Sequence, residues 1–128
     1  SKLNEHGADI ATSGLIDFGN DKRATFDISF ECTRRSEFEA FGALGRVKCP
    51  TVWQPDDKQA KIIINTESSG LTEEVVPAAN HFILEINHFN KVISSDIVPK
   101  LSNEDAFWNA KTLECIQQSI EEDSWVNL

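Results

Sequence analysis

Ala-Thr-Phe-Asp-Ile-Ser-Phe-Glu-Cys, residues 24–32, alternates apolar and polar side chains over a full strand length. Successive side chains of a β-strand point to opposite faces, so this period of two predicts a strand with one buried and one polar face. Such half-buried alternation belongs to an antiparallel sheet with one covered face, and not to the doubly buried parallel sheet of a nucleotide-binding domain. We therefore expect an antiparallel sheet around this strand.

The chain on either side of this strand predicts more antiparallel strands. Gly19-Asn20-Asp21-Lys22 has the composition of a tight hairpin turn that joins the strand to the one before it. Gly42-Ala43-Leu44-Gly45 predicts the turn of a second hairpin. The expected strands are 13–18, 24–32, 37–41, 46–49 and 60–66, and the expected loops are 51–59 and 67–72.

Two amphipathic helices are expected after the strands. From about Pro77 to Ile93, apolar residues recur at steps of three and four, which is typical of a helix with one apolar face. A second helix is expected from Ser102 to about Glu121, with an apolar stripe made by Ala106, Phe107, Ala110, Leu113, Ile116 and Ile120. Its first turn is acidic, and Ser102 is a good N-cap residue.

Strands followed by helices predict an α+β fold, with residues 1–128 as a single domain. We expect a mainly antiparallel, open-faced sheet of about five or six strands, with the two C-terminal helices on one face. That face is the one that carries Phe26, Ile28 and Phe30. A chain of 128 residues is too short to hold a dinucleotide-binding domain and a substrate domain together.

Composition excludes several classes of function. The net charge of −9 disfavours binding to nucleic acid and to anionic membranes, because such binding depends on Lys and Arg. Ile62-Ile63-Ile64, the longest aliphatic run, is far shorter than the roughly 20 apolar residues of a membrane-spanning helix. With no export signal visible at the N-terminus, we expect a cytoplasmic protein. Cys32, Cys49 and Cys115 have unrelated spacings and fit reduced thiols.

The residues offer little catalytic chemistry. His81, Glu85 and His88 share one face of a predicted helix, but one straight helix seldom supplies a complete ligand set, so we expect no metal site. Neither a Gly-rich dinucleotide loop nor a nucleophile elbow is present, so we expect no catalytic and no cofactor-binding residue. Trp53 is the one candidate for substrate binding, since an aromatic ring near a sheet end can stack on a sugar. The alternative is that Trp53 packs within its own domain.

Four segments, in order along the chain, carry a family pattern. They are Gly-Leu-Ile-Asp-Phe-Gly-Asn at 14–20 with Ala24 and the alternating strand, Phe-Gly-Ala-Leu-Gly-Arg-Val at 41–47 with Pro50, His-Phe-Ile-Leu-Glu-Ile at 81–86, and Ser-Asn-Glu-Asp-Ala at 102–106 with Ser119 and Val-Asn-Leu at 126–128. Together they resemble the C-terminal domain of the Gfo/Idh/MocA oxidoreductases, which include glucose-fructose oxidoreductase and inositol dehydrogenase. The family's turn threonine is Ala43 here, and the chain has no tyrosine.

The resemblance implies a full-length enzyme that uses NAD or NADP and acts on a sugar, polyol or diol. The Rossmann domain, the catalytic lysine and an Asp/His pair would lie outside this chain, which would bind no cofactor and be inactive alone. In the family this domain forms one wall of the substrate cleft and pairs subunits through its open sheet face, so we expect a homodimer or a higher homo-oligomer. In this chain the open face is the one that carries Thr25, Asp27, Ser29 and Glu31. The competing hypothesis is a stand-alone sheet-and-helix module that binds a ligand or a protein.

Overall fold

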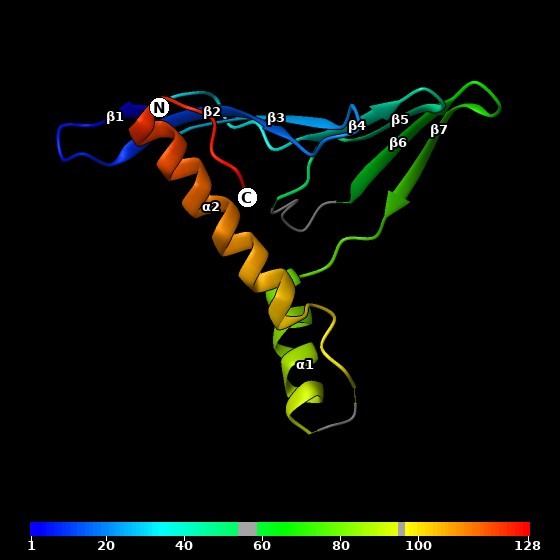
Figure 1. Ribbon diagram of the computed structural model, residues 1–128. Coiled ribbons are helices and arrows are strands. Elements are labelled where there is room, and N and C mark those ends of the chain that lie inside the picture. Colours follow the sequence, from blue (N-terminus) through cyan, green and yellow to red (C-terminus); the bar gives the residue numbers. More distant parts are fainter. Residues whose placement is uncertain (54–58, 95–96) are drawn as a thin grey trace. The chain divides into compact units, whose positions relative to one another are not determined.

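The computed structural model describes residues 1–53, 59–94 and 97–128. In this part of the chain seven antiparallel strands are followed by two helices, so the predicted α+β class is confirmed (Figure 1). The expected single sheet of five or six strands is wrong, because the strands form one sheet of three and one of four. The chain divides into two compact units, residues 1–33 with 100–128 and residues 34–99, and each is described by itself below.

The first unit contains the three-stranded sheet, in the order β1-β2-β3. The strands β1 (Lys2–Leu3), β2 (Asp9–Asp17) and β3 (Arg23–Ser29) pair antiparallel. The β2–β3 turn is the predicted one, and Gly19, Asn20 and Asp21 all have positive φ, which suits Gly, Asn and Asp best. The short β1 and the first residues of β2 were not predicted from the sequence.

Gly14 and Phe26 face each other across this hairpin. A Cβ atom at Gly14 would lie 2.7 Å from the Phe26 ring, so glycine is what allows the ring to lie over the neighbouring strand. Phe26 is half-buried, but Ile28 is 66% exposed and Phe30 is 89% exposed. The prediction that helices cover all three side chains is therefore wrong beyond Phe26.

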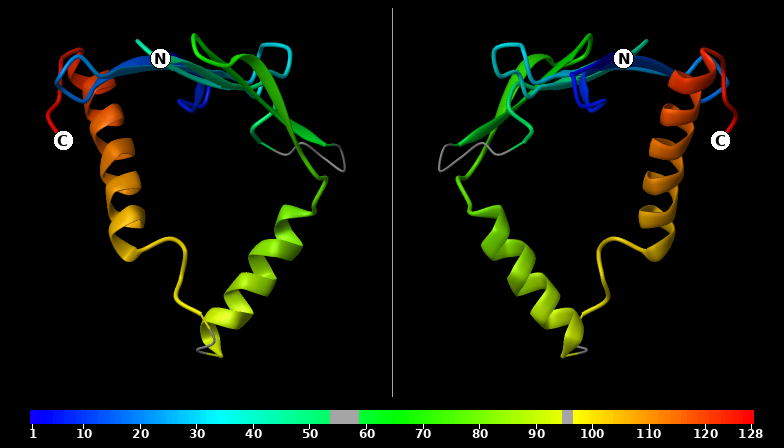
Figure 2. Two further views of the ribbon diagram at one scale, coloured as in Figure 1. Left: turned by 90° about the vertical axis from the view of Figure 1, so that its right-hand side faces the viewer. Right: turned by 90° about the vertical axis from the view of Figure 1, so that its left-hand side faces the viewer.

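Helix α2 (Asn103–Glu122) completes the first unit and is followed by the extended C-terminal tail, residues 124–128 (Figure 2). The Ser102 hydroxyl oxygen accepts a hydrogen bond from the Asp105 backbone N–H at 3.1 Å, and Asp105 Oδ2 accepts one from the Ser102 backbone N–H at 2.8 Å. This reciprocal capping box confirms the predicted start of the helix. The helix ends at Asp123, which has φ 48°.

The second unit contains the four-stranded sheet, in the order β4-β5-β6-β7. Its strands are β4 (Phe38–Gly42), β5 (Gly45–Cys49), β6 (Ala60–Thr66) and β7 (Gly70–Val76). The first three agree with the sequence prediction. β7 begins within residues 67–72, which were expected to be loop, and its acidic composition is possible because it is an exposed edge strand.

Helix α1 (His81–Ile93) also belongs to the second unit. Asn80 caps it, since Asn80 Oδ1 accepts a hydrogen bond from the Ile83 backbone N–H at 3.1 Å. The sequence pattern placed the start of this helix at about Pro77, and the helix begins four residues later, at His81. Neither helix of the described chain is both long and apolar enough to cross a membrane.

Candidate functional site

Trp53, the predicted substrate-binding residue, lies just after β5 on a backbone held by Ser36. The Trp53 backbone N–H donates to Ser36 Oγ at 2.8 Å, and the same hydroxyl donates to the Trp53 carbonyl at 3.2 Å. Arg34 Nη2 adds a donor to this carbonyl at 3.4 Å. The Trp53 side chain is 71% exposed, so its main chain is fixed while its ring remains open to a flat ligand.

No group of three or more His, Cys, Asp or Glu residues in the described chain is placed to hold a metal ion. The His81 ring lies beside the Phe82 ring at the start of α1, with ring centroids 4.1 Å apart and the planes tilted by 38°. His81, Glu85 and His88 belong to no such group among the residues that the structure describes.

The four-stranded sheet has one apolar and one ion-paired face. The register places Phe38, Val47 and Ile64 on one side. The other side carries three ion pairs, Arg46–Glu39 at 3.5 Å, Lys48–Glu37 at 2.9 Å and Lys61–Glu73 at 2.8 Å. Lys48 also lowers the pKa of Glu37, by its hydrogen bond and by its charge. Charges of both signs lie on this face together with the exposed apolar side chains of Phe41 and Leu71.

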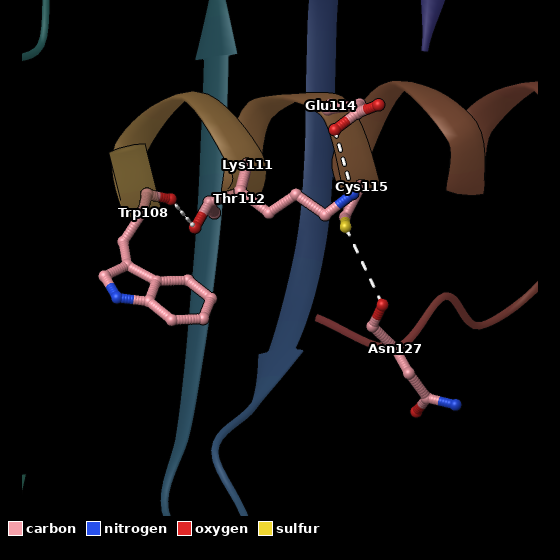
Figure 3. A network of polar contacts seen from close by, with 6 residues as sticks. All are labelled: Trp108, Lys111, Thr112, Glu114, Cys115 and Asn127. Atoms are coloured by element: carbon pink, nitrogen blue, oxygen red, sulfur yellow. Dashed lines mark hydrogen bonds and ion pairs between the residues drawn. The ribbon is translucent and has the colours of Figure 1, made fainter. Parts of the chain in front are cut away.

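Cys115 is the one buried residue among those described, with 5% of its surface exposed. Its Sγ lies 3.8 Å from the Asn127 carbonyl, so α2 and the C-terminal tail meet at this thiol (Figure 3). Glu114, the residue before Cys115, accepts a hydrogen bond from Lys111 at 2.9 Å and raises the pKa of that ammonium group. Cys32, Cys49 and Cys115 are all free thiols.

A cavity of about 380 Å³ lies beside Cys115 within the first unit. Its walls come from β2, from one side of α2, from Phe26 and from the tail. They are Ser13, Gly14, Leu15, Ile16, Asp17, Phe26, Thr112, Cys115, Ile116, Ser119, Ile120, Trp125, Val126, Asn127 and Leu128.

This cavity was not found in the sequence, although the apolar stripe of α2 was a signal for it. The predicted stripe included Ile116 and Ile120, which do line the cavity, and also Phe107 and Leu113. The last two are 59% and 60% exposed, so the inward side of the helix is rotated from the predicted one. Small polar residues, Thr112 and Ser119, complete that inward side.

The chain matches no family model, no curated protein and no solved structure. The resemblance to the Gfo/Idh/MocA oxidoreductases consequently rests on its four sequence segments. Each segment lies on an element of the expected type: residues 14–20 on β2 and its turn, 41–47 on the β4–β5 hairpin, 81–86 on α1, and 102–106 on the first turn of α2.

Proposed function

We propose that this chain is the C-terminal domain of an NAD(P)-dependent oxidoreductase of the Gfo/Idh/MocA type. In this proposal the enzyme acts on a sugar, polyol or diol, and the domain forms one wall of the substrate cleft and the subunit interface. NAD or NADP is held by another domain, and the chain alone is inactive. The observation that carries the proposal is an amphipathic helix that follows four antiparallel strands along the chain and whose apolar side is left uncovered.

That uncovered side belongs to α1. Its apolar side chains follow the spacing i, i+4, i+7 and i+11, so they form one stripe along the helix. All four are more than half exposed: Phe82, Ile86, Phe89 and Ile93. A contiguous apolar stripe on a soluble protein marks a surface that is covered by something else. A domain that packs against the rest of an enzyme supplies such a surface.

We assign subunit pairing to the ion-paired face of the four-stranded sheet, in place of the β3 face of Thr25, Asp27, Ser29 and Glu31 that the sequence indicated. A two-fold interface brings the same patch of both copies together, so it needs a self-complementary surface. Opposite charges side by side, such as Arg46 and Glu39 or Lys48 and Glu37, satisfy this need. Protein interfaces combine polar side chains and bridging waters with apolar contacts.

Trp53 is the residue that we assign to the substrate wall. Its exposed ring offers a flat apolar surface to the C–H face of a sugar or polyol. A neutral substrate fits a strongly acidic chain better than a phosphorylated one does. The net negative charge of the chain and the lack of a Gly-rich loop both support a dinucleotide site in another domain.

Two measurements on the purified chain test this proposal. Isothermal titration with NAD⁺ and NADP⁺ should show no binding, and no sugar or polyol should reduce either nucleotide; tight nucleotide binding or any turnover would contradict it. Sedimentation equilibrium should show dimers that Lys48→Glu weakens. Lys22→Glu, which reverses a charge in the β2–β3 turn, is the control and should leave association unchanged. A monomer at high protein concentration would contradict the interface assignment.

A further inference from the structure

We propose that the cavity between β2, α2 and the C-terminal tail binds one small, neutral aromatic molecule that carries a hydrogen-bond donor. This inference does not depend on the oxidoreductase proposal, because every wall of the cavity lies within the first unit. A volume of about 380 Å³ lies within the range of roughly 300–1,000 Å³ that small-molecule pockets occupy.

The apolar part of the lining selects a ring compound. Phe26, Ile116 and Ile120 form apolar walls on two different elements. Gly14 has no side chain, so the Phe26 ring lies against the backbone of β2 at this position. Trp125 lines the cavity while 71% of its surface is exposed, so the cavity is open to solvent on the side of the tail and a ligand can enter there.

The charges around the cavity select a neutral ligand. Asp17 is the one Asp, Glu, Lys or Arg residue in the lining. Its carboxylate is already engaged, since Oδ1 accepts from the Gly19 backbone N–H at 2.8 Å and Oδ2 pairs with Arg23 Nε at 3.3 Å. An ionic ligand would therefore lose hydration without gaining an unengaged counter-charge.

The two hydroxyl groups that α2 contributes to the lining select a donor on that ligand. Thr112 donates its hydroxyl hydrogen to the Trp108 carbonyl at 2.8 Å, and Ser119 donates its own to the Ser124 carbonyl at 2.6 Å. With both hydrogens used, these oxygens present acceptor lone pairs. The Asn127 carbonyl, which receives only the weak thiol contact at 3.8 Å, is a third acceptor. An O–H or N–H group on the ring completes this set.

Fluorescence titration with 2-naphthol tests the proposal. In the Trp53→Phe/Trp108→Phe variant, Trp125 is the single tryptophan and reports from the cavity wall. We expect saturable quenching with one site per chain. 2-Methoxynaphthalene keeps the ring but lacks the donor, so it should bind roughly 2–10-fold more weakly, the worth of one hydrogen bond. Quenching that does not saturate, or equal affinity for the two compounds, overturns the proposal.

A matched pair of helix variants locates the site. Ile116→Phe places a larger ring inside the cavity and should abolish 2-naphthol binding. Leu113→Phe makes the same kind of change on an outward position of the same helix and should leave binding intact. Equal binding by both variants would place the ligand elsewhere, for instance on the apolar stripe of α1.

A third readout on the unaltered chain does not depend on how these variants fold. Saturating 2-naphthol should slow the reaction of Cys115 with N-ethylmaleimide, measured by peptide mass spectrometry. Cys32, which is exposed and does not line the cavity, should react at an unchanged rate. Unchanged labelling of Cys115 would overturn the proposal.

Discussion

Gly45 is the residue at which the second unit should be most sensitive to a single methyl group. It begins β5, directly after the turn at 43–44, and pairs with Gly42 on one side and with Thr66 on the other. Its φ is 150°, which L side chains rarely adopt. A Cβ atom there would lie 2.4 Å from the Asn65 carbonyl oxygen and 3.1 Å from the Thr66 Cα, both of which are backbone atoms.

Two costs add up in Gly45→Ala. The unfavourable φ costs about 1–3 kcal/mol. Forcing the neighbouring strand β6 away from the new methyl group costs about 1–3 kcal/mol more, since a backbone cannot rotate aside as a side chain can. Against this, alanine restricts the unfolded chain and returns about 0.4–1 kcal/mol. The net loss is about 1–6 kcal/mol, a large share of the roughly 5–15 kcal/mol that stabilise a typical domain.

Gly42→Ala is the matched control, because it alters the other end of the same turn. A Cβ atom at Gly42 meets nothing within 4 Å, so the free energy of unfolding should change by less than about 1 kcal/mol. Urea titrations in a Trp108→Phe/Trp125→Phe background follow Trp53, the one tryptophan of the second unit. Equal urea midpoints for Gly45→Ala and Gly42→Ala would refute the steric reasoning.

Further predictions concern both units. Ser102→Ala removes the α2 cap and should cost about 1 kcal/mol, seen as a lower midpoint of thermal unfolding by circular dichroism; an unchanged midpoint would mean that the capping box does not stabilise the helix. The backbone N–H and hydroxyl of Ser102 hold the pKa of Asp105 below its usual value, so its stabilisation is present above about pH 4 and is lost as the pH falls through the lowered pKa. Asp105→Asn should therefore lose less stability than the unaltered chain between pH 6 and pH 2, and equal losses in urea titrations would contradict this. Gly14→Ala pushes a methyl group against the Phe26 ring and should cost about 1–3 kcal/mol in the urea titration of the first unit, whereas a neutral effect would show that the ring moves aside freely. Phe89→Ser should change the stability of the isolated chain by less than about 0.5 kcal/mol, because this side chain is 61% exposed, and a large loss would show that α1 is covered in solution.

The features that the sequence predicted well are those with a local physical cause. The alternation at residues 24–32 predicted β3, although the strand ends at Ser29. The composition of residues 19–22 predicted the turn before it. The start of α2 could be predicted because the two capping partners, Ser102 and Asp105, are only three residues apart in the sequence. Each of these signals needs no knowledge of the rest of the chain.

The features that were missed depend on partners far away in the sequence. β7 has the composition of a loop around Glu73 and Glu74, and it becomes a strand because β6 pairs with it along its whole length. The division into two sheets depends likewise on which strand edges form hydrogen bonds.

The same limit applies to the candidate sites. Trp53 could be singled out as a lone aromatic residue beside a strand. The cavity beside Cys115 could not, because its walls come from residues 13–17, Phe26, residues 112–120 and the tail, which meet only in the folded unit. The apolar periodicity of α2 identified Ile116 and Ile120, which line the cavity. It could not distinguish them from Leu113, which is exposed.

The transcript that encodes this chain tests the proposed function most directly. If the chain is the C-terminal domain of an NAD(P)-dependent oxidoreductase, sequencing should show one reading frame that joins it to an upstream βαβ unit, with a Gly-rich loop after the first strand. A start codon directly ahead of Ser1, with no such unit in frame, would contradict the proposal and favour a stand-alone binding module.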